Sequence, residues 1–264
     1  MSCDDLLIGG TLSASGITGN TSINSTALMV YDWSGLLGTP GISGSSLGVN
    51  GRPGGFLAGD QLGRQRFFNV NIQATKYGPN ITLTEPTADE QLRENTDDFL
   101  TLITEPETLL EILEPDGSRW YLVVTNLDAG YTNRARTTRR WSIPLVSDWP
   151  YWRRTTSETQ TLNGVDQMNI QGRKSIYDAV LVFSGDGTFT HTDLGWAIEV
   201  TGSTGPVTVD LGARTVIEGG SPATNRIRRT PAAGEGRVWG WFTTGLQNVQ
   251  SDVSVDVTFR EQKV

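Results

Sequence analysis

The sequence predicts a mainly β protein of two domains with one helix, and three observations support this. Apolar and polar residues alternate with a period of two along several segments, as in strands that bury one face. Glycine accounts for 31 of the 264 residues, and turn-forming residues separate the apolar runs. One segment, 87–103, has a helical period instead.

Residues 68–74 form the clearest strand of the first half. Phenylalanine, valine, isoleucine and alanine alternate there with asparagine and glutamine, so we expect one face of this strand to be buried. Residues 28–33 give a weaker strand signal. Between the two strands lies the glycine-rich segment 38–56, GTPGISGSSLGVNGRPGGF.

The glycine-rich segment is expected to be an extended, ordered arm. A phosphate-binding loop needs a lysine followed by serine or threonine after its last glycine, and this segment contains no lysine. A dinucleotide-binding fingerprint needs a helix directly afterwards, whereas a strand is predicted here. A flexible linker fits poorly, because arginine, leucine, valine and proline interrupt the glycines. Glycines let a backbone pass close to a neighbour, and Arg52 could reach a carboxylate or a carbonyl.

The helix is predicted over residues 87–103, TADEQLRENTDDFLTLI. Thr87 and Glu90 have the spacing of a capping box. The apolar residues share one helical face, although Asp97 and Asp98 weaken the middle of the pattern. A hairpin is predicted next, with strands TLLEIL and RWYLVV joined by the turn EPDGS.

An aromatic–proline junction, SDWPYW, precedes the predicted domain boundary. Pro150 restricts the preceding residue to an extended conformation, and the sequence then becomes polar. We therefore assign 1–155 and 156–264 to separate domains. Short apolar runs separated by turn residues predict a β-sandwich or barrel for the second domain. These runs are IYDAVLVF, WAIEV, PVTVDL, GRVWGWF and SDVSVDVTF.

Composition limits the compartment and the partners. The net charge of −8 argues against a nucleic acid as the main partner, because phosphate binding requires a basic excess. Cys3 is the single cysteine, so an intramolecular disulfide is excluded. No apolar run approaches the roughly 20 residues that span a bilayer, and the N-terminus does not resemble a signal peptide. We expect a soluble protein that is made in a cytoplasm and does not insert into membranes.

The sequence predicts no catalytic residue, cofactor or bound metal. A catalytic triad would require His191, the single histidine, which is interpreted as a half-exposed strand residue. One histidine and the distant Cys3 cannot supply the ligands of a structural zinc site. Asp186, Asp193 and Asn133 are conceivable calcium ligands, but GDG and LDAG more often form turns. The acidic residues of the first domain do not form an evident carboxylate pair for glycoside hydrolysis.

Charge is distributed unevenly in the first domain. Residues 89–116 are acidic and residues 134–154 are rich in arginine. A chain with both surfaces can bind copies of itself head to tail around a closed ring. Pairing of these charges within one domain is the alternative. The residues predicted at a subunit contact are Arg52, Pro53, Phe56, Asp97, Asp98, Arg136, Arg139 and Arg140.

Several of these pieces together resemble the distal tail proteins of long, non-contractile-tailed phages, in particular minor tail proteins of phages of actinobacteria. They are GTPGISGSSLGVNGRPGGF, DDFLTLITEPETLLEILEPDGSRWYLVV, SDWPYW and a terminal strand such as DVSVDVTFRE. Their order covers nearly the whole chain. The first 155 residues carry most of the resemblance, and the second half matches in pattern rather than in motif.

The resemblance implies a structural role without enzymatic activity. Such proteins form a six-fold ring at the distal end of the tail tube. The ring is built by the N-terminal domain, which is expected to be a β-sandwich or barrel with one helix and a long glycine-rich arm. A galectin-like C-terminal β-sandwich extends outward and in some relatives supports receptor-binding proteins or binds saccharide. The implied partners are five further copies of the chain, the tail tube protein, tail hub or tip proteins, and a receptor-binding protein or host glycan. The implied location is the virion tail tip, after synthesis in the cytoplasm of the host bacterium.

An alternative is a carbohydrate-binding protein that adheres to the host surface through its second domain. Trp196, Trp239 and Trp241 could stack on sugars. They also fit the period of ordinary strands, which favours core packing for at least two of them. A cell-wall hydrolase is disfavoured, because the sequence offers neither a triad nor metal ligands.

Overall fold

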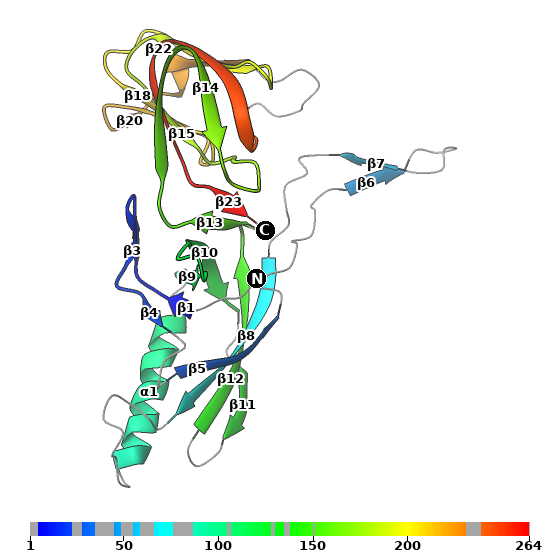
Figure 1. Ribbon diagram of the computed structural model, residues 1–264, viewed down its shortest axis with the longest axis vertical. Coiled ribbons are helices and arrows are strands. Elements are labelled where there is room, and N and C mark those ends of the chain that lie inside the picture. Colours follow the sequence, from blue (N-terminus) through cyan, green and yellow to red (C-terminus); the bar gives the residue numbers. More distant parts are fainter. Residues whose placement is uncertain are drawn as a thin grey trace. The chain divides into compact units, whose positions relative to one another are not determined.

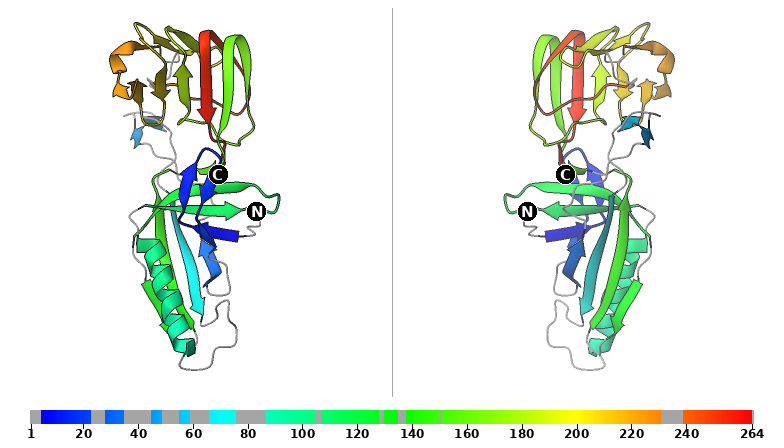
Figure 2. Two further views of the ribbon diagram at one scale, coloured as in Figure 1. Left: turned by 90° about the vertical axis from the view of Figure 1, so that its left-hand side faces the viewer. Right: turned by 90° about the vertical axis from the view of Figure 1, so that its right-hand side faces the viewer.

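Two compact units make up the chain: Met1–Ile42 with Gly63–Thr155, and Ser43–Leu62 with Thr156–Lys263. Strands dominate both units (Figures 1 and 2), which confirms the mainly β prediction. The structure is a computed structural model and describes residues 5–22, 28–34, 45–48, 55–58, 66–75, 87–104, 107–127, 130–134, 138–149, 151–230 and 239–263. None of the helices in these ranges is long and apolar enough to span a bilayer.

Unit 1 is an antiparallel sheet with one helix. The sheet order is β4-β1-β9-β10-β12-β8-β5, with β11 beside β12, while β2 and β3 form a separate hairpin. Its elements are β1 (Asp5–Ile8), β2 (Thr11–Ser13), β3 (Gly16–Thr18), β4 (Thr21–Ser22), β5 (Leu28–Ser34), β8 (Arg66–Thr75), α1 (Thr87–Thr104), β9 (Thr108–Leu113), β10 (Arg119–Asn126), β11 (Gly130–Arg134), β12 (Thr138–Ser147) and β13 (Trp152–Arg154).

The predicted strands and hairpin of unit 1 are confirmed. β5 and β8 cover the expected segments, and Val70, Ile72 and Ala74 of β8 are buried. β9 and β10 pair in the expected hairpin. In its turn, Gly117 has a φ of 81° and the carboxylate of Asp116 accepts the Ser118 N–H, so both residues favour the turn.

Helix α1 lies along one face of the sheet and confirms the predicted helix (Figure 2). Leu92, Phe99 and Ile103 are buried, and the Phe99 ring lies 5.6 Å from that of Trp141 on β12. Asp97 and Asp98 do not interrupt the buried face of the helix, because both are exposed. The middle of that face is instead formed by polar residues. Thr96, for example, is buried and donates its hydroxyl to the Leu92 carbonyl at 2.6 Å. The side chain of Thr87, and so the predicted capping box, lies outside the described residues.

Unit 2 is a curled antiparallel sheet of order β20-β19-β18-β15-β22-β16-β17-β21, with β14 beside β22. Its elements are β14 (Glu158–Ile170), β15 (Val180–Phe183), β16 (Gly187–His191), β17 (Trp196–Val200), β18 (Val207–Asp210), β19 (Thr215–Glu218), β20 (Ser221–Pro222), the short 3-10 helix η1 (Thr224–Arg226), β21 (Ile227–Thr230), β22 (Gly245–Phe259) and β23 (Gln262–Lys263).

One ribbon of two long strands, β14 and β22, runs through the curled sheet of unit 2 (Figure 1). The first half of β22 pairs with β16 and its second half pairs with β15. The ribbon has a bulge between Leu162 and Gly164, where Gly164 has a φ of 82°. β14 is bent so that its two ends approach each other. The side-chain amide of Gln160, near one end, donates to the Asn169 carbonyl, near the other, at 3.0 Å.

The segment GRVWGWF was predicted to form a strand. This prediction is wrong for the part of the segment that the structure describes, residues 239–242. This segment contributes only a single bridge, between Ile176 and Phe242. Gly240 lies against the indole of Trp196, since a Cβ there would come within 2.6 Å of the ring. Aromatic side chains therefore hold the segment in place instead of a ladder of backbone hydrogen bonds.

Candidate interaction surfaces

The acidic residues of α1 form an exposed surface opposite its core face. We call Asp89, Glu90, Glu94, Asp97 and Asp98 the acidic helix surface. Within the described part of the chain, Asp97 and Asp98 make no ion pair. Their charges are therefore available to a partner.

Two of the predicted basic residues, Arg139 and Arg140, lie on β12. Arg139 is half-buried and, within the described ranges, makes no ion pair; Arg140 is exposed and donates its Nε–H to Gln73 Oε1 at 2.8 Å. Arg136 lies outside the described residues. The structure thus places Arg139 and Arg140 on one strand without joining them to the acidic helix surface.

An apolar patch lies on the face of the unit 1 sheet opposite α1. Phe67 of β8 is 61% exposed and stands opposite Val146 of β12. Leu127, which follows β10, is 56% exposed, and its N–H bonds the Pro144 carbonyl at 3.0 Å. We call Phe67, Leu127, Pro144 and Val146 the apolar patch. Exposed apolar groups on adjacent strands are typical of interaction sites.

Hydrogen-bonded polar side chains cover the sheet face beside the apolar patch. The Asn69 amide donates to the Ser142 hydroxyl at 2.7 Å, and the hydroxyl donates back to Asn69 Oδ1 at 3.1 Å. On the neighbouring strands, Asn71 Nδ2 donates to Asp32 Oδ2 at 3.2 Å. These contacts fix the polar side chains, so the face is ordered around the apolar patch.

The glycine-rich segment contains a hairpin. β6 (Ser45–Gly48) pairs with β7 (Gly55–Ala58) in antiparallel register. Phe56 lies on β7 opposite Leu47, but its side chain is outside the described residues, as are Arg52 and Pro53. Their predicted role at a subunit contact stays a prediction.

Two of the three tryptophans proposed to contact sugar belong to the core. Trp196 and Trp241 are only 2% and 7% exposed, so neither offers a face on which a sugar could stack. Trp239 is partly buried, and the guanidinium of Arg229 lies 4.4 Å from the centre of its ring. Core packing, the alternative weighed from the sequence, therefore applies to Trp196 and Trp241.

The prediction that His191 is half-exposed is wrong, because its side chain is fully buried. Its Nε2 lies 2.7 Å from Gln247 Oε1, and its Nδ1 accepts the Leu194 N–H at 3.3 Å. Burial lowers the pKa of His191 below its ordinary value. The ring is a neutral core group enclosed by Trp196 and Phe242.

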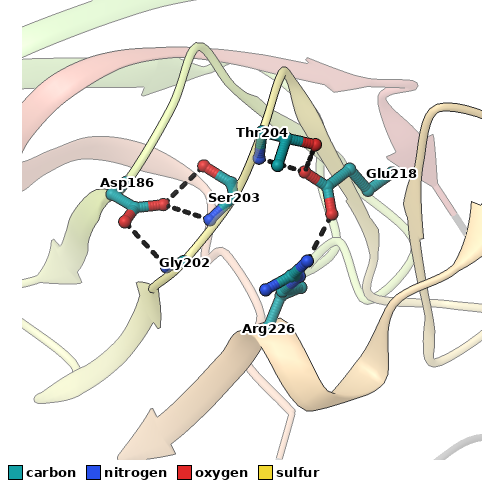
Figure 3. A network of polar contacts seen from close by, with 6 residues as sticks. All are labelled: Asp186, Gly202, Ser203, Thr204, Glu218 and Arg226. Carbon is teal, nitrogen blue, oxygen red and sulfur yellow. Dashed lines mark hydrogen bonds and ion pairs between the residues drawn. The ribbon is translucent and has the colours of Figure 1, made fainter.

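The aspartates considered as calcium ligands bind backbone donors in turns. Asp186 accepts the N–H groups of Gly202 and Ser203 at 2.7 and 2.6 Å, together with the Ser203 hydroxyl (Figure 3). Asp193 accepts the N–H and the side-chain amide of Asn248. These hydrogen bonds lower the pKa of both carboxyl groups. Asn133 lies on β11 of the other unit.

The carboxylate of Glu218 binds the loop that Asp186 also binds. Glu218 accepts the N–H and the hydroxyl of Thr204 (Figure 3), and Arg226 donates its Nε–H to Glu218 Oε2 at 3.1 Å. We call residues 201–206 the clamped loop, because Asp186 and Glu218 hold it from two sides.

No protein-family model matches this sequence, and no curated protein matches it. Solved structures do. The Dit protein (gp 19.1) of phage SPP1, described as a paradigm of the hub adsorption apparatus in phages that infect Gram-positive bacteria, aligns with a TM-score of 0.65 at 13% identity. The alignment covers 92% of this chain and 96% of Dit. A chain of the phage p2 baseplate in its activated conformation aligns with a TM-score of 0.50 at 11% identity, over 98% of each chain. The predicted resemblance to distal tail proteins is thus confirmed for the fold.

Proposed function

We propose that this protein is a structural component of the tail tip of a long, non-contractile-tailed phage, acting as its distal tail protein. The observation that carries the proposal is the alignment with Dit across both units of the chain. A match confined to one unit would fit any β-sandwich protein. The alignment covers 92% of this chain, so it includes residues of both the helix-bearing sheet and the curled sheet.

The proposed assembly is a hexameric ring of identical copies. Within the described residues, β5 pairs only with β8 and β11 pairs only with β12, so the unit 1 sheet has an edge at each of these strands. Open edges readily pair with further strands. The acidic helix surface and Arg139 supply opposite charges for head-to-tail contact between copies, which closes into a ring when the rotation fits.

The remaining partners follow from a position at the end of the tube. One side of the ring would bind the tail tube protein, and the other would bind the tail hub or tip proteins. The apolar patch is proposed to contact a neighbouring subunit, because burying it would remove apolar surface from water. The role is non-enzymatic, and unit 2 would contact a receptor-binding protein or the host surface.

Carbohydrate binding by unit 2 is the second candidate, and Trp239 is the residue that favours it. This tryptophan is partly exposed, unlike Trp196 and Trp241. A sugar would have to displace the Arg229 guanidinium from the ring or bind the opposite face. A monomer that binds glycans, and loses this binding on Trp239→Ala, would favour this candidate over the ring.

Light scattering after size-exclusion chromatography tests the assembly. A ring gives a mass near six times that of one chain. Asp97→Arg and Arg139→Glu should each weaken association severalfold, because like charges would then face each other. The double variant, Asp97→Arg with Arg139→Glu, should regain most of the association, because opposite charges would face each other again. Arg173→Glu reverses the charge of an exposed arginine of unit 2; it is the control and should associate normally. A chain that stays monomeric at high concentration and is absent from assembled particles would refute the proposal.

A further inference from the structure

A short irregular segment of unit 2, residues 239–243, crosses the aromatic core; we call it the strap. Its backbone forms an isolated bridge with Ile176, in which Ile176 and Phe242 exchange two hydrogen bonds, of 2.8 and 2.9 Å. Side chains supply further contacts to the strap.

Two side chains bind the strap backbone. The Trp196 indole N–H donates to the Trp241 carbonyl at 2.9 Å. The Gln247 amide binds Thr243 twice, since its Oε1 accepts the Thr243 N–H at 2.9 Å and its Nε2 donates to the Thr243 carbonyl at 2.5 Å. Both contacts require fixed orientations of Trp196 and Gln247.

His191 contacts both of these side chains. Its ring centre lies 5.5 Å from that of Trp196 and 5.6 Å from that of Phe242. Its Nδ1 accepts the Leu194 N–H, so the ring hydrogen must lie on Nε2, where it is donated to Gln247 Oε1. The neutral tautomer thus satisfies both neighbours, and the side chain is fully buried.

Protonation would break this arrangement. A second hydrogen on Nδ1 would face the Leu194 N–H, donor against donor. The cation would also be buried among aromatic rings, which disfavours the charged form. Asp193 is the charged group whose field favours protonation. However, its carboxylate already accepts two hydrogen bonds from Asn248, and the effect of burial is the larger.

We propose that His191 and the strap form an acid-sensitive latch, in which protonation of the ring releases residues 239–243 and uncovers Trp196 and Trp241. The latch lies within unit 2 and does not depend on ring formation. Acid would thereby convert a closed aromatic core into an exposed apolar surface without unfolding the other unit.

The direction of the pH effect follows from proton linkage. A histidine whose pKa is lowered in the closed state binds its proton more readily in the open state. The latch is therefore fully stable above about pH 6.5, the ordinary histidine value. Below that value, the equilibrium constant for opening rises by up to about tenfold per pH unit, until the closed state also binds the proton.

The single histidine makes the test direct, because its ring resonance needs no assignment. NMR of the full chain between pH 7.5 and 5.5 would follow this resonance together with amide protection factors, corrected for intrinsic exchange. Ordinary carboxylates stay ionised in this range. Protection factors at the amides of Phe242 and Thr243, which donate to the Ile176 carbonyl and to Gln247 Oε1, should fall by up to about tenfold per pH unit below pH 6.5, while those at Leu181 and Val209 in the strands should stay constant.

His191→Gln supplies the matched variant, because glutamine can donate and accept hydrogen bonds but does not titrate. Its strap protection should not change with pH over the same range. If this variant does not fold, the unmodified chain still decides the matter. Strap protection that stays constant between pH 7.5 and 5.5, whether or not the histidine resonance titrates in this range, would overturn the latch. An equal loss of protection in His191→Gln would also overturn it.

Discussion

The variant Phe67→Ser is expected to weaken association between copies of the chain while leaving the free energy of unfolding nearly unchanged. Fully burying a phenylalanine side chain contributes about 1.5–3 kcal/mol relative to exposure. Phe67 is 61% exposed in the single chain, so that share remains to be buried at a subunit contact. The expected contribution is about 1–2 kcal/mol per contact, or roughly a tenfold change in the association constant. The free energy of unfolding should change by only about 0.5 kcal/mol, because the side chain is mostly exposed.

Sedimentation equilibrium over a concentration series measures the first quantity, and urea unfolding measures the second. Leu246→Ser is the matched control, since Leu246 is 63% exposed and belongs to unit 2. Phe67→Ser should shift the association midpoint about tenfold upward, and the control should not shift it. Equal association of Phe67→Ser and the unmodified chain, or an equal loss in the control, would refute the role of the apolar patch.

Three further predictions concern unit 2. Gly240→Ala should destabilise the unit by about 1–3 kcal/mol in urea unfolding, because its Cβ would overlap the Trp196 ring; Gly205→Ala, where space is open, should be nearly neutral. Phe189→Ala should lower stability by about 3–5 kcal/mol, since the ring is fully buried, and a smaller loss would contradict its core position. The Asp186 carboxylate should hold the clamped loop above about pH 4, and its hydrogen bonds to the loop should be lost as the pH falls through its lowered pKa. Asp186→Asn should therefore speed proteolysis of the clamped loop already at pH 7. Unchanged cleavage of this variant would contradict the role of Asp186.

Local sequence patterns predicted the elements whose burial is regular. Helix α1 was located to within one residue, because Leu92, Phe99 and Ile103 mark a single face. β14 was missed because it buries few side chains and carries mainly polar residues. The segment around Gly240 was misassigned, because its apolar residues pack on Trp196 rather than in a ladder, and such packing has no local signature.

The interaction surfaces were only partly accessible from the sequence. The acidic helix surface and Arg139 were predicted from runs of like charge in the sequence. Charged residues are usually exposed, so this prediction did not require knowledge of the tertiary structure. The apolar patch was missed, although the period-two pattern places Phe67 on the polar face of β8. Recognising it requires the register that sets Phe67 beside Val146. The burial of His191 likewise depends on Gln247, 56 residues away.

The bent ribbon of β14 and β22 has a mechanical consequence. β22 pairs with β16 in its first half and with β15 in its second half, and β14 pairs with β22 along its length. These two parts of the sheet therefore share one continuous pair of strands. Losing the side-chain contacts between them would leave them joined by the backbones of β14 and β22.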